Sequence, residues 1–161
     1  MLRMRALVFV LFALIVGIGC TKQEEKKTET ATPSHGEAAP KKEATVVVPE
    51  SVKGKWKGVK IAVTDKVSGK ESVYTVMIGS EFAIPNSNLA IRVDTFLPHF
   101  MMEGTTLTSQ SNDPKNPAAQ IRILEGGKEI FKGWLFSLYP TTHTFQHPRF
   151  GFTLVDFIPA S

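Results

Sequence analysis

The chain has 161 residues, of which 21% are charged, and its formal net charge is +4 at pH 7. This charge is too mild to indicate a nucleic-acid-binding protein, in which Lys and Arg gather in a strongly basic patch. Cys20 is the single cysteine, so the chain cannot form an internal disulfide.

The first twenty residues have the layout of a bacterial lipoprotein signal. Two arginines make a positive start, an apolar run follows over residues 6–16, and small residues lead to Cys20. The run is shorter than the about 20 residues of a membrane-spanning helix, so we predict a removed signal peptide over residues 1–19. The segment resembles a lipobox, although Gly17 stands where a large aliphatic residue is usual. This resemblance predicts that Cys20 carries the lipid.

The lipid on Cys20 predicts a membrane-anchored protein, because two or more acyl chains hold a protein stably on a bilayer. By resemblance to Gram-negative lipoproteins, Thr21 in place of an aspartate favours the outer membrane, facing the periplasm. Residues 20–52 are rich in Lys, Glu, Thr, Ala and Pro, which predicts a disordered tether. Within it, residues 45–48 could dock as an edge strand. The remaining residues, 53–161, are enough for one domain with its own core.

The domain alternates apolar and polar residues in short runs, which is typical of strands. Two-residue periodicity predicts strands at 56–67, 72–78, 82–84, 89–94, 119–124, 129–136 and 150–158. Gly126-Gly127 between two of these runs predicts a hairpin, because tight hairpin turns need positive φ. In the last strand we expect Phe150, Phe152, Leu154 and Asp156 to share one face, and Phe157 to lie on the other.

Residues 98–117 are predicted to form an irregular connection that includes at most a brief strand at 105–108. Connections of this length are uncommon in compact domains and are often functional or mobile. Apolar residues nowhere recur with a helical period over ten residues of the domain. We therefore predict an all-β fold, a single antiparallel β-sandwich or barrel-like domain.

The last third of the chain resembles the bacterial DUF2155 family. The residues that carry the resemblance are Gly133-Trp134-Leu135-Phe136, then His147-Pro148, and Asp156 near the end of the final strand. The turn Asp65–Lys70 is also similar to a turn of that family. The resemblance covers about residues 57–157 and implies an envelope protein of similar fold, without implying an activity. Many members carry a cysteine pair that this chain lacks.

Two segments of the domain are candidates for a binding surface, because they gather aromatic, methionine and histidine side chains. These are the start of the long connection and the segment that follows Gly133. The candidate residues are His99, Phe100, Met101, Met102, Trp134, Phe136, Tyr139, His143 and His147. Core packing of Trp134 and Phe136, or a pocket of Trp134, Tyr139 and Phe145, are the alternatives. For His147 the alternative is a hydrogen bond within the turn before the last strand.

Several of these residues are also candidates for other chemistry. His99, Met101, Met102, His143 and His147 are of types that hold metal or haem, so a metal- or haem-handling accessory protein is the second hypothesis. A zinc-protease motif, a haem-attachment motif, a Gly-x-Ser-x-Gly motif and a phosphate loop are absent from the sequence. Ser137, His147 and Asp156 could converge, but their spacing does not require it. We expect a non-enzymatic protein without a cofactor that binds or scaffolds an envelope protein.

Overall fold

The structure is a computed structural model that describes residues 44–143 and 145–161. The predicted signal peptide, Cys20 and the tether up to residue 43 lie outside the described residues. The strands are β1 Thr45–Val46, β2 Trp56–Asp65, β3 Lys70–Met77, β4 Glu81–Ala83, β5 Leu89–Leu97, β6 Phe100–Glu103, β7 Thr106–Ser109, β8 Ala118–Glu125, β9 Lys128–Phe136 and β10 Phe150–Pro159. None of the described residues belongs to a helix that could cross a membrane.

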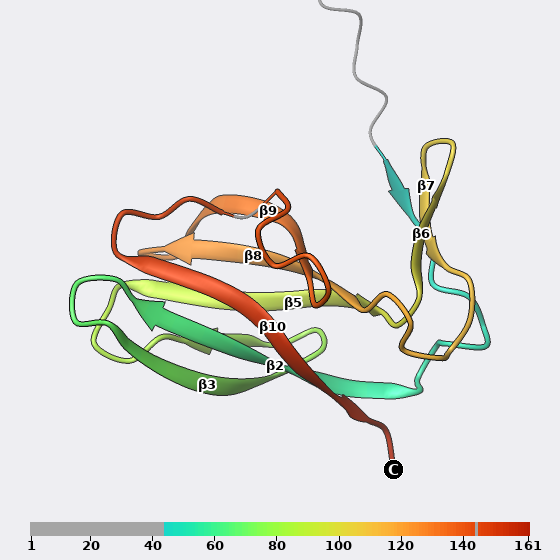
Figure 1. The fold of residues 1–161 in the computed structure, drawn as a ribbon, viewed down its shortest axis with the longest axis horizontal. Helices are drawn as coiled ribbons and strands as arrows, with labels where there is room; N and C mark the ends of the chain where they lie inside the picture. Colours follow the sequence, from blue (N-terminus) through green and yellow to red (C-terminus); the bar gives the residue numbers. More distant parts are fainter. Residues whose placement is uncertain (1–43, 144) are drawn as a thin grey trace, which may run out of the picture. The chain divides into compact units, whose positions relative to one another are not determined.

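The strands form three open sheets, which confirms the all-β prediction and favours a sandwich over a closed barrel. One sheet has the order β10-β2-β3 and a second has the order β4-β5-β8-β9. Figure 1 shows these two sheets stacked, with the third sheet standing at one end of the stack. That third sheet has the order β1-β7-β6. Neighbouring strands are antiparallel throughout, except that β1 runs parallel to β7.

The core lies between the two larger sheets and is made of aliphatic side chains from alternate positions of their strands. Ile61 on β2, Ile91 on β5, and Ile121 and Ile123 on β8 are fully buried. Alternation along these strands places every second residue in this layer, as the sequence pattern predicts. Gly126 and Gly127 both have positive φ in the turn between β8 and β9, which confirms the predicted hairpin.

Irregular residues in β5 and β10 change which face of each strand enters the core. The ladders shift register between Val93 and Thr95 on β5, and between Leu154 and Asp156 on β10. An extra residue in a strand reverses the side-chain alternation beyond it. Phe157 consequently packs inward, and its ring centroid lies 5.3 Å from that of Phe96. The prediction that Phe157 lies on the face opposite Leu154 is therefore wrong.

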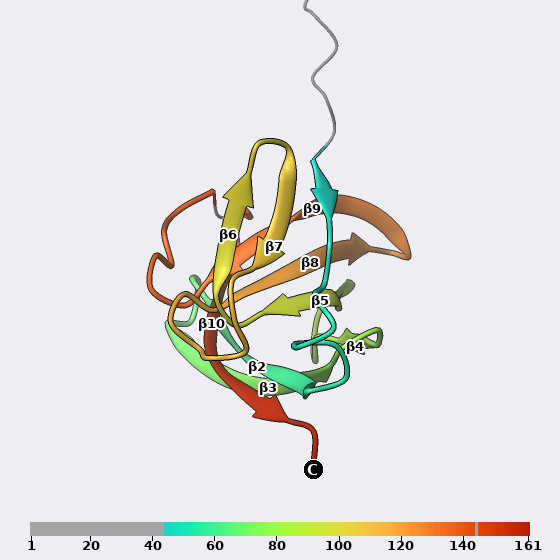
Figure 2. The ribbon, with the colours of Figure 1, turned by 90° about the vertical axis from the view of Figure 1, so that its right-hand side faces the viewer.

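Residues 98–117 form the predicted irregular connection only in part. Half of the segment is the β6–β7 hairpin, turned at Gly104 with a φ of 61°, and β7 corresponds to the brief strand predicted at 105–108. Residues 110–117 lie outside the strands. Figure 2 shows this hairpin rising beside β1, above the ends of the larger sheets. Because Thr45 and Val46 of β1 pair with Thr106 and Leu107 of β7, residues 45–48 dock as predicted.

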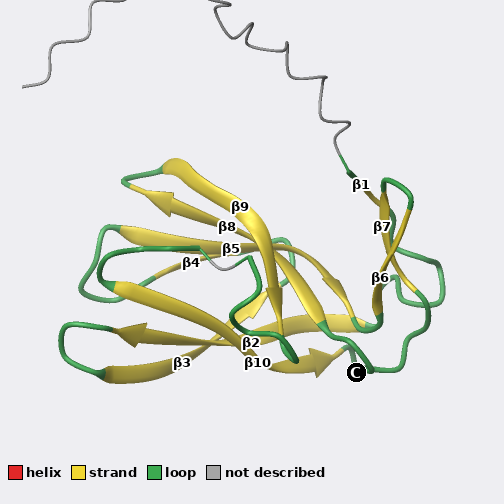
Figure 3. Cartoon of the chain, turned by 45° about the horizontal axis from the view of Figure 1, so that its top comes forward, coloured by secondary structure: helices red, strands yellow, loops and turns green. Residues whose placement is uncertain are grey.

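The folded part of the chain begins before the boundary predicted at Lys53. Val52 is only 2% exposed, and its main-chain N–H donates to the carbonyl of Pro49 at 2.9 Å. Residues 45–52 therefore belong to the β-domain rather than to the predicted tether. Figure 3 shows the residues that follow β1 as loop leading to β2.

Candidate binding groove

An apolar groove of about 620 Å³ lies between the β6–β7 hairpin and β9. Most of the side chains that line it are aromatic or aliphatic. The groove is lined by Phe100, Met102, Leu107, Phe131, Lys132, Gly133, Trp134, Phe136, Thr142 and His143. Its volume and its mostly apolar lining with a few polar groups are those of small-ligand pockets, which span about 300–1,000 Å³.

Phe100 joins the two walls of the groove. Its ring lies edge-on to Trp134 and to Phe136, with a centroid distance of 5.1 Å in both cases. Trp134 and Phe136 stand two residues apart on β9 and therefore share a face of that strand. Edge-to-face aromatic pairs add about 0.5–1.5 kcal/mol beyond their area burial, so this cluster holds the hairpin against the sheet.

Met102 forms the exposed rim of the groove. It lies two residues after Phe100 on β6, on the same face of the strand, and 62% of it is exposed. Methionine side chains are flexible and polarizable, and they are common at surfaces that adapt to a ligand. Met102 is thus an apolar side chain that the fold leaves available for contact.

Gly133 shapes the β9 wall of the groove. A Cβ at this position would lie 2.4 Å from Cζ of Phe131, whose ring covers the glycine. The Phe131 ring also packs against Phe145, with the centroids 5.0 Å apart. Glycine at position 133 therefore leaves room for the Phe131 ring.

Five of the nine predicted binding residues line the groove, and they come from two segments far apart in the sequence. These five are Phe100, Met102, Trp134, Phe136 and His143. His99, Met101, Tyr139 and His147 are outside its lining. The sequence did not identify Leu107, Phe131, Lys132 or Thr142 as binding residues. Only Lys132 could have been found, because it lies two residues before Trp134 and so shares its face of the strand.

His99, directly before β6, and Met101 on β6 are outside the groove lining, because they alternate with Phe100 and Met102 along extended backbone. His99 Nδ1 is 3.3 Å from the hydroxyl of Ser111, and its main-chain N–H donates to Ser109 Oγ at 2.9 Å. The histidine and methionine side chains that could hold metal or haem therefore do not all lie together. Within the described residues, no group of three or more His, Cys, Asp or Glu side chains is arranged to hold a metal ion.

His147 lies in the turn before β10, where its side chain accepts main-chain hydrogen bonds. Its Nδ1 accepts from the N–H groups of Arg149 and Phe150 at 3.2 Å and 3.0 Å. The imidazole also stacks on the Phe150 ring at a centroid distance of 5.6 Å. His147 thus makes hydrogen bonds within the turn, which was the alternative to a role in surface binding.

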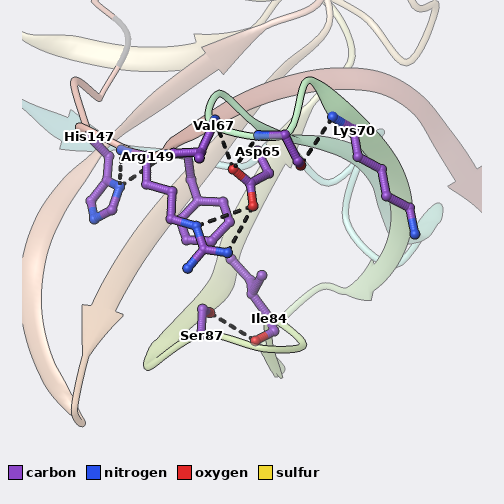
Figure 4. Close-up of polar contacts among 9 residues, drawn as sticks. Asp65, Val67, Lys70, Ile84, Ser87, His147 and Arg149 are labelled. Carbon is purple, nitrogen blue, oxygen red and sulfur yellow. Dashed lines mark hydrogen bonds and ion pairs between the residues drawn. The ribbon is translucent and has the colours of Figure 1, made fainter.

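A polar cluster surrounds Asp65 at the same end of β10 (Figure 4). Arg149 donates two hydrogen bonds to Oδ2 of Asp65, from Nη2 at 2.8 Å and from Nε at 3.2 Å. Oδ1 of Asp65 accepts the N–H of Val67 at 2.9 Å. The hydrogen bonds from Arg149, together with those from Val67 and Ser68, lower the pKa of Asp65 despite its partial burial. The cluster ties the β2–β3 turn to the turn before β10.

Asp65, Arg149 and nine other residues enclose a smaller pocket of about 140 Å³. The carboxylate of Asp65 and the guanidinium of Arg149 are already paired inside it, so neither presents a free charge to a ligand. This pocket is therefore a weaker candidate for a binding site than the apolar groove.

His147 and Asp156, two of the three residues named as candidates for catalysis, lie apart, the first before β10 and the second on it. Asp156 pairs with Lys60, with 2.7 Å between Oδ2 and Nζ, and this ion pair lowers the pKa of the carboxyl group. His147 lies beside Phe150, which is opposite Asp65 on β2. Lys60 and Asp65 are separated by about 16 Å of extended strand, so Asp156 does not reach His147.

Charged side chains border the groove on the outer face of the four-stranded sheet. Arg122 on β8 donates to Asp94 at 2.6 Å and to Glu129 at 3.0 Å, and these carboxylates raise its pKa further. Lys132 is paired in register with Arg122 and is exposed. Among the described residues, none forms an ion pair with Lys132.

Comparisons of the chain with protein-family models, with curated proteins and with solved structures found no match.

Proposed function

We propose that this protein is a lipid-anchored component of the bacterial envelope whose β-domain binds another envelope component in the apolar groove. The observation that carries the proposal is the convergence of Phe100 and Met102 on β6 with Trp134 and Phe136 on β9. Folded proteins rarely leave a concave aromatic surface open unless a partner or ligand covers it. The function is binding rather than catalysis.

The anchor part of the proposal rests on the residues around Cys20. The positive start, the short apolar run and the polar residues after Cys20 support lipidation at that cysteine and attachment to the outer membrane, facing the periplasm. Membership of the DUF2155 family remains part of the proposal, supported by Gly133-Trp134-Leu135-Phe136 and His147-Pro148. Replacing Cys20 with Ser should move the protein from the membrane fraction to the soluble fraction.

A photo-crosslinking residue in place of Met102 tests the binding part of the proposal in intact cells. Met102 lies at the groove rim, whereas Val73 on β3 is comparably exposed, at 53%, and does not line the groove. We expect a discrete adduct from position 102, identified by mass spectrometry, and none from position 73. Trp134→Ala should abolish that adduct while the protein level stays unchanged. Equal adducts from both positions would contradict the proposal.

One observation favours the second hypothesis, a haem-handling accessory protein. Met102 and His143 both line the groove, and these side chains serve as haem ligands in other proteins. His143 has a φ of 50°, a conformation that few residues other than glycine adopt. Titration with haemin would show an absorbance shift that His143→Ala abolishes. An unchanged haemin spectrum would remove this hypothesis.

A further inference from the structure

We propose that the groove binds a single-chain amphiphile that carries one carboxylate, that is, a long-chain fatty acid. This inference rests on the proposed function and names the chemical class of the envelope component. The aliphatic chain would lie against Phe100, Trp134 and Phe136, and the carboxylate would face Lys132 and Thr142.

The groove floor suits an aliphatic chain better than an added peptide strand. A peptide that joins a sheet edge needs free main-chain donors and acceptors. At Phe100 these groups are occupied, because its N–H donates to the carbonyl of Asn116 and its carbonyl accepts Asn116 Nδ2, both at 2.9 Å. At Phe100 the floor therefore offers aromatic surface rather than main-chain hydrogen bonds, and aromatic surface attracts hydrocarbon.

The positive charge of Lys132 indicates where the carboxylate of the ligand would lie. Lys132 lines the groove, and no ion pair neutralises it among the residues that the structure describes. Across the ladder, the guanidinium of Arg122 is held by Asp94 and Glu129. A single ammonium group matches the single charge of a carboxylate, and the hydroxyl of Thr142 is an additional donor beside it.

Calorimetric titration of the chain carrying Cys20→Ser, which has no acyl chain of its own, tests the inference. The probes are octanoate, decanoate and dodecanoate below their micelle concentrations, with dodecanol as the neutral match. We expect one site, and each added CH₂ should tighten binding by up to about fourfold while the groove still has room. Dodecanol should bind more weakly than dodecanoate.

Matched variants separate the two ends of the ligand. Lys132→Gln should weaken dodecanoate about threefold to tenfold and leave dodecanol unchanged, whereas Lys128→Gln, on the same strand outside the groove, should change neither. Trp134→Ala should weaken both probes at least about tenfold. If Trp134→Ala fails to fold, Met102→Glu at the exposed rim provides the same test.

Three results would overturn the inference. They are equal binding of dodecanoate and dodecanol, binding that Lys132→Gln leaves intact, and tighter binding of dodecyl phosphocholine than of dodecanoate. A protein adduct from position 102 without dodecanoate binding would keep the proposed function and reject the fatty acid. Neither adduct nor binding would reject both.

Discussion

Trp56 on β2 donates its indole N–H to Oδ1 of Asn112, in the loop that follows β7, at 2.8 Å. The same ring lies edge-on to Phe96 and Phe157, with centroid distances of 5.0 Å and 5.2 Å. The loop at the base of the β6–β7 hairpin is therefore fastened to the core through one indole. Because that hairpin forms one wall of the groove, this hydrogen bond also helps to position Phe100.

Replacing Asn112 with Ala should lower the free energy of unfolding by about 1 kcal/mol, because one side-chain hydrogen bond is lost. Urea denaturation followed by tryptophan fluorescence measures the change. Asn112→Asp is the matched control, since it keeps an oxygen acceptor near the indole and should lose less. Equal losses in both variants would show that the hydrogen bond to Trp56 is not the cause.

Leu154 and Val155 are neighbours on β10 with opposite surroundings. Leu154 is 1% exposed in the core, whereas Val155, at the irregular position of the strand, is 46% exposed. Leu154→Ala should cost about 2–5 kcal/mol of unfolding free energy, because it leaves a cavity. Val155→Ala should stay within about 0.5 kcal/mol of the wild type. The reverse ranking in thermal or urea unfolding would place the β10 register elsewhere.

Gly133→Ala should cost about 1–3 kcal/mol, because the new methyl group must displace the Phe131 ring that lies 2.4 Å from its position. Displacing that ring also changes the β9 wall, so the variant should bind groove ligands less tightly. Gly151→Ala on β10 is the matched control, since its Cβ would meet only ordinary contacts at 3.8 Å. Similar melting temperatures for the two variants would argue against the Phe131 contact.

Asp65 should make folding stability depend on pH in the acid range. Hydrogen bonds from Arg149 hold the pKa of Asp65 in the folded state below its ordinary value of 3.8. A lowered carboxyl pKa stabilises the folded state above about pH 4, and this stabilisation is lost as the pH falls through the folded-state pKa. Unfolding free energies measured between about pH 6 and 2 should therefore decline in the wild type.

Asp65→Asn and Arg149→Gln should each reduce this decline, because the first removes the titrating carboxyl group and the second removes its main hydrogen-bond donor. Asp156, whose pKa is lowered by Lys60, keeps part of the pH dependence in both variants. A pH dependence as steep in both variants as in the wild type would refute the assignment to Asp65.

The strands of the two larger sheets could be predicted because their alternation records burial directly. Ile61, Ile91 and Ile121 each stand between more polar neighbours, and each is buried. The reversals on β5 and β10 could not be predicted, because an extra residue such as Val155 has no distinctive side chain. Of the β6–β7 hairpin, only a brief strand at 105–108 was predicted, because both strands have four residues, joined by Gly104 and Thr105.

The sequence could predict which types of residue form the candidate site, but not how these residues are arranged in space. Phe100 and Trp134 stood out as aromatic residues in unusual segments, but their 5.1 Å contact depends on how the hairpin folds back onto β9. Lys132 was not singled out, because one exposed lysine on a strand is ordinary. His147 and Tyr139 are of the same residue types as the groove residues, yet both follow the end of β9 and neither lines the groove.

The parallel pairing of β1 with β7 decides how the domain bears mechanical load. Main-chain hydrogen bonds join these segments, among them those from Thr45 to the carbonyl of Thr105 and from Val47 to that of Leu107, both at 2.9 Å. A pull applied at residue 44 reaches these bonds before it reaches the long ladder between β2 and β10. Tension would therefore detach a short strand first, while the strands around the core stay joined.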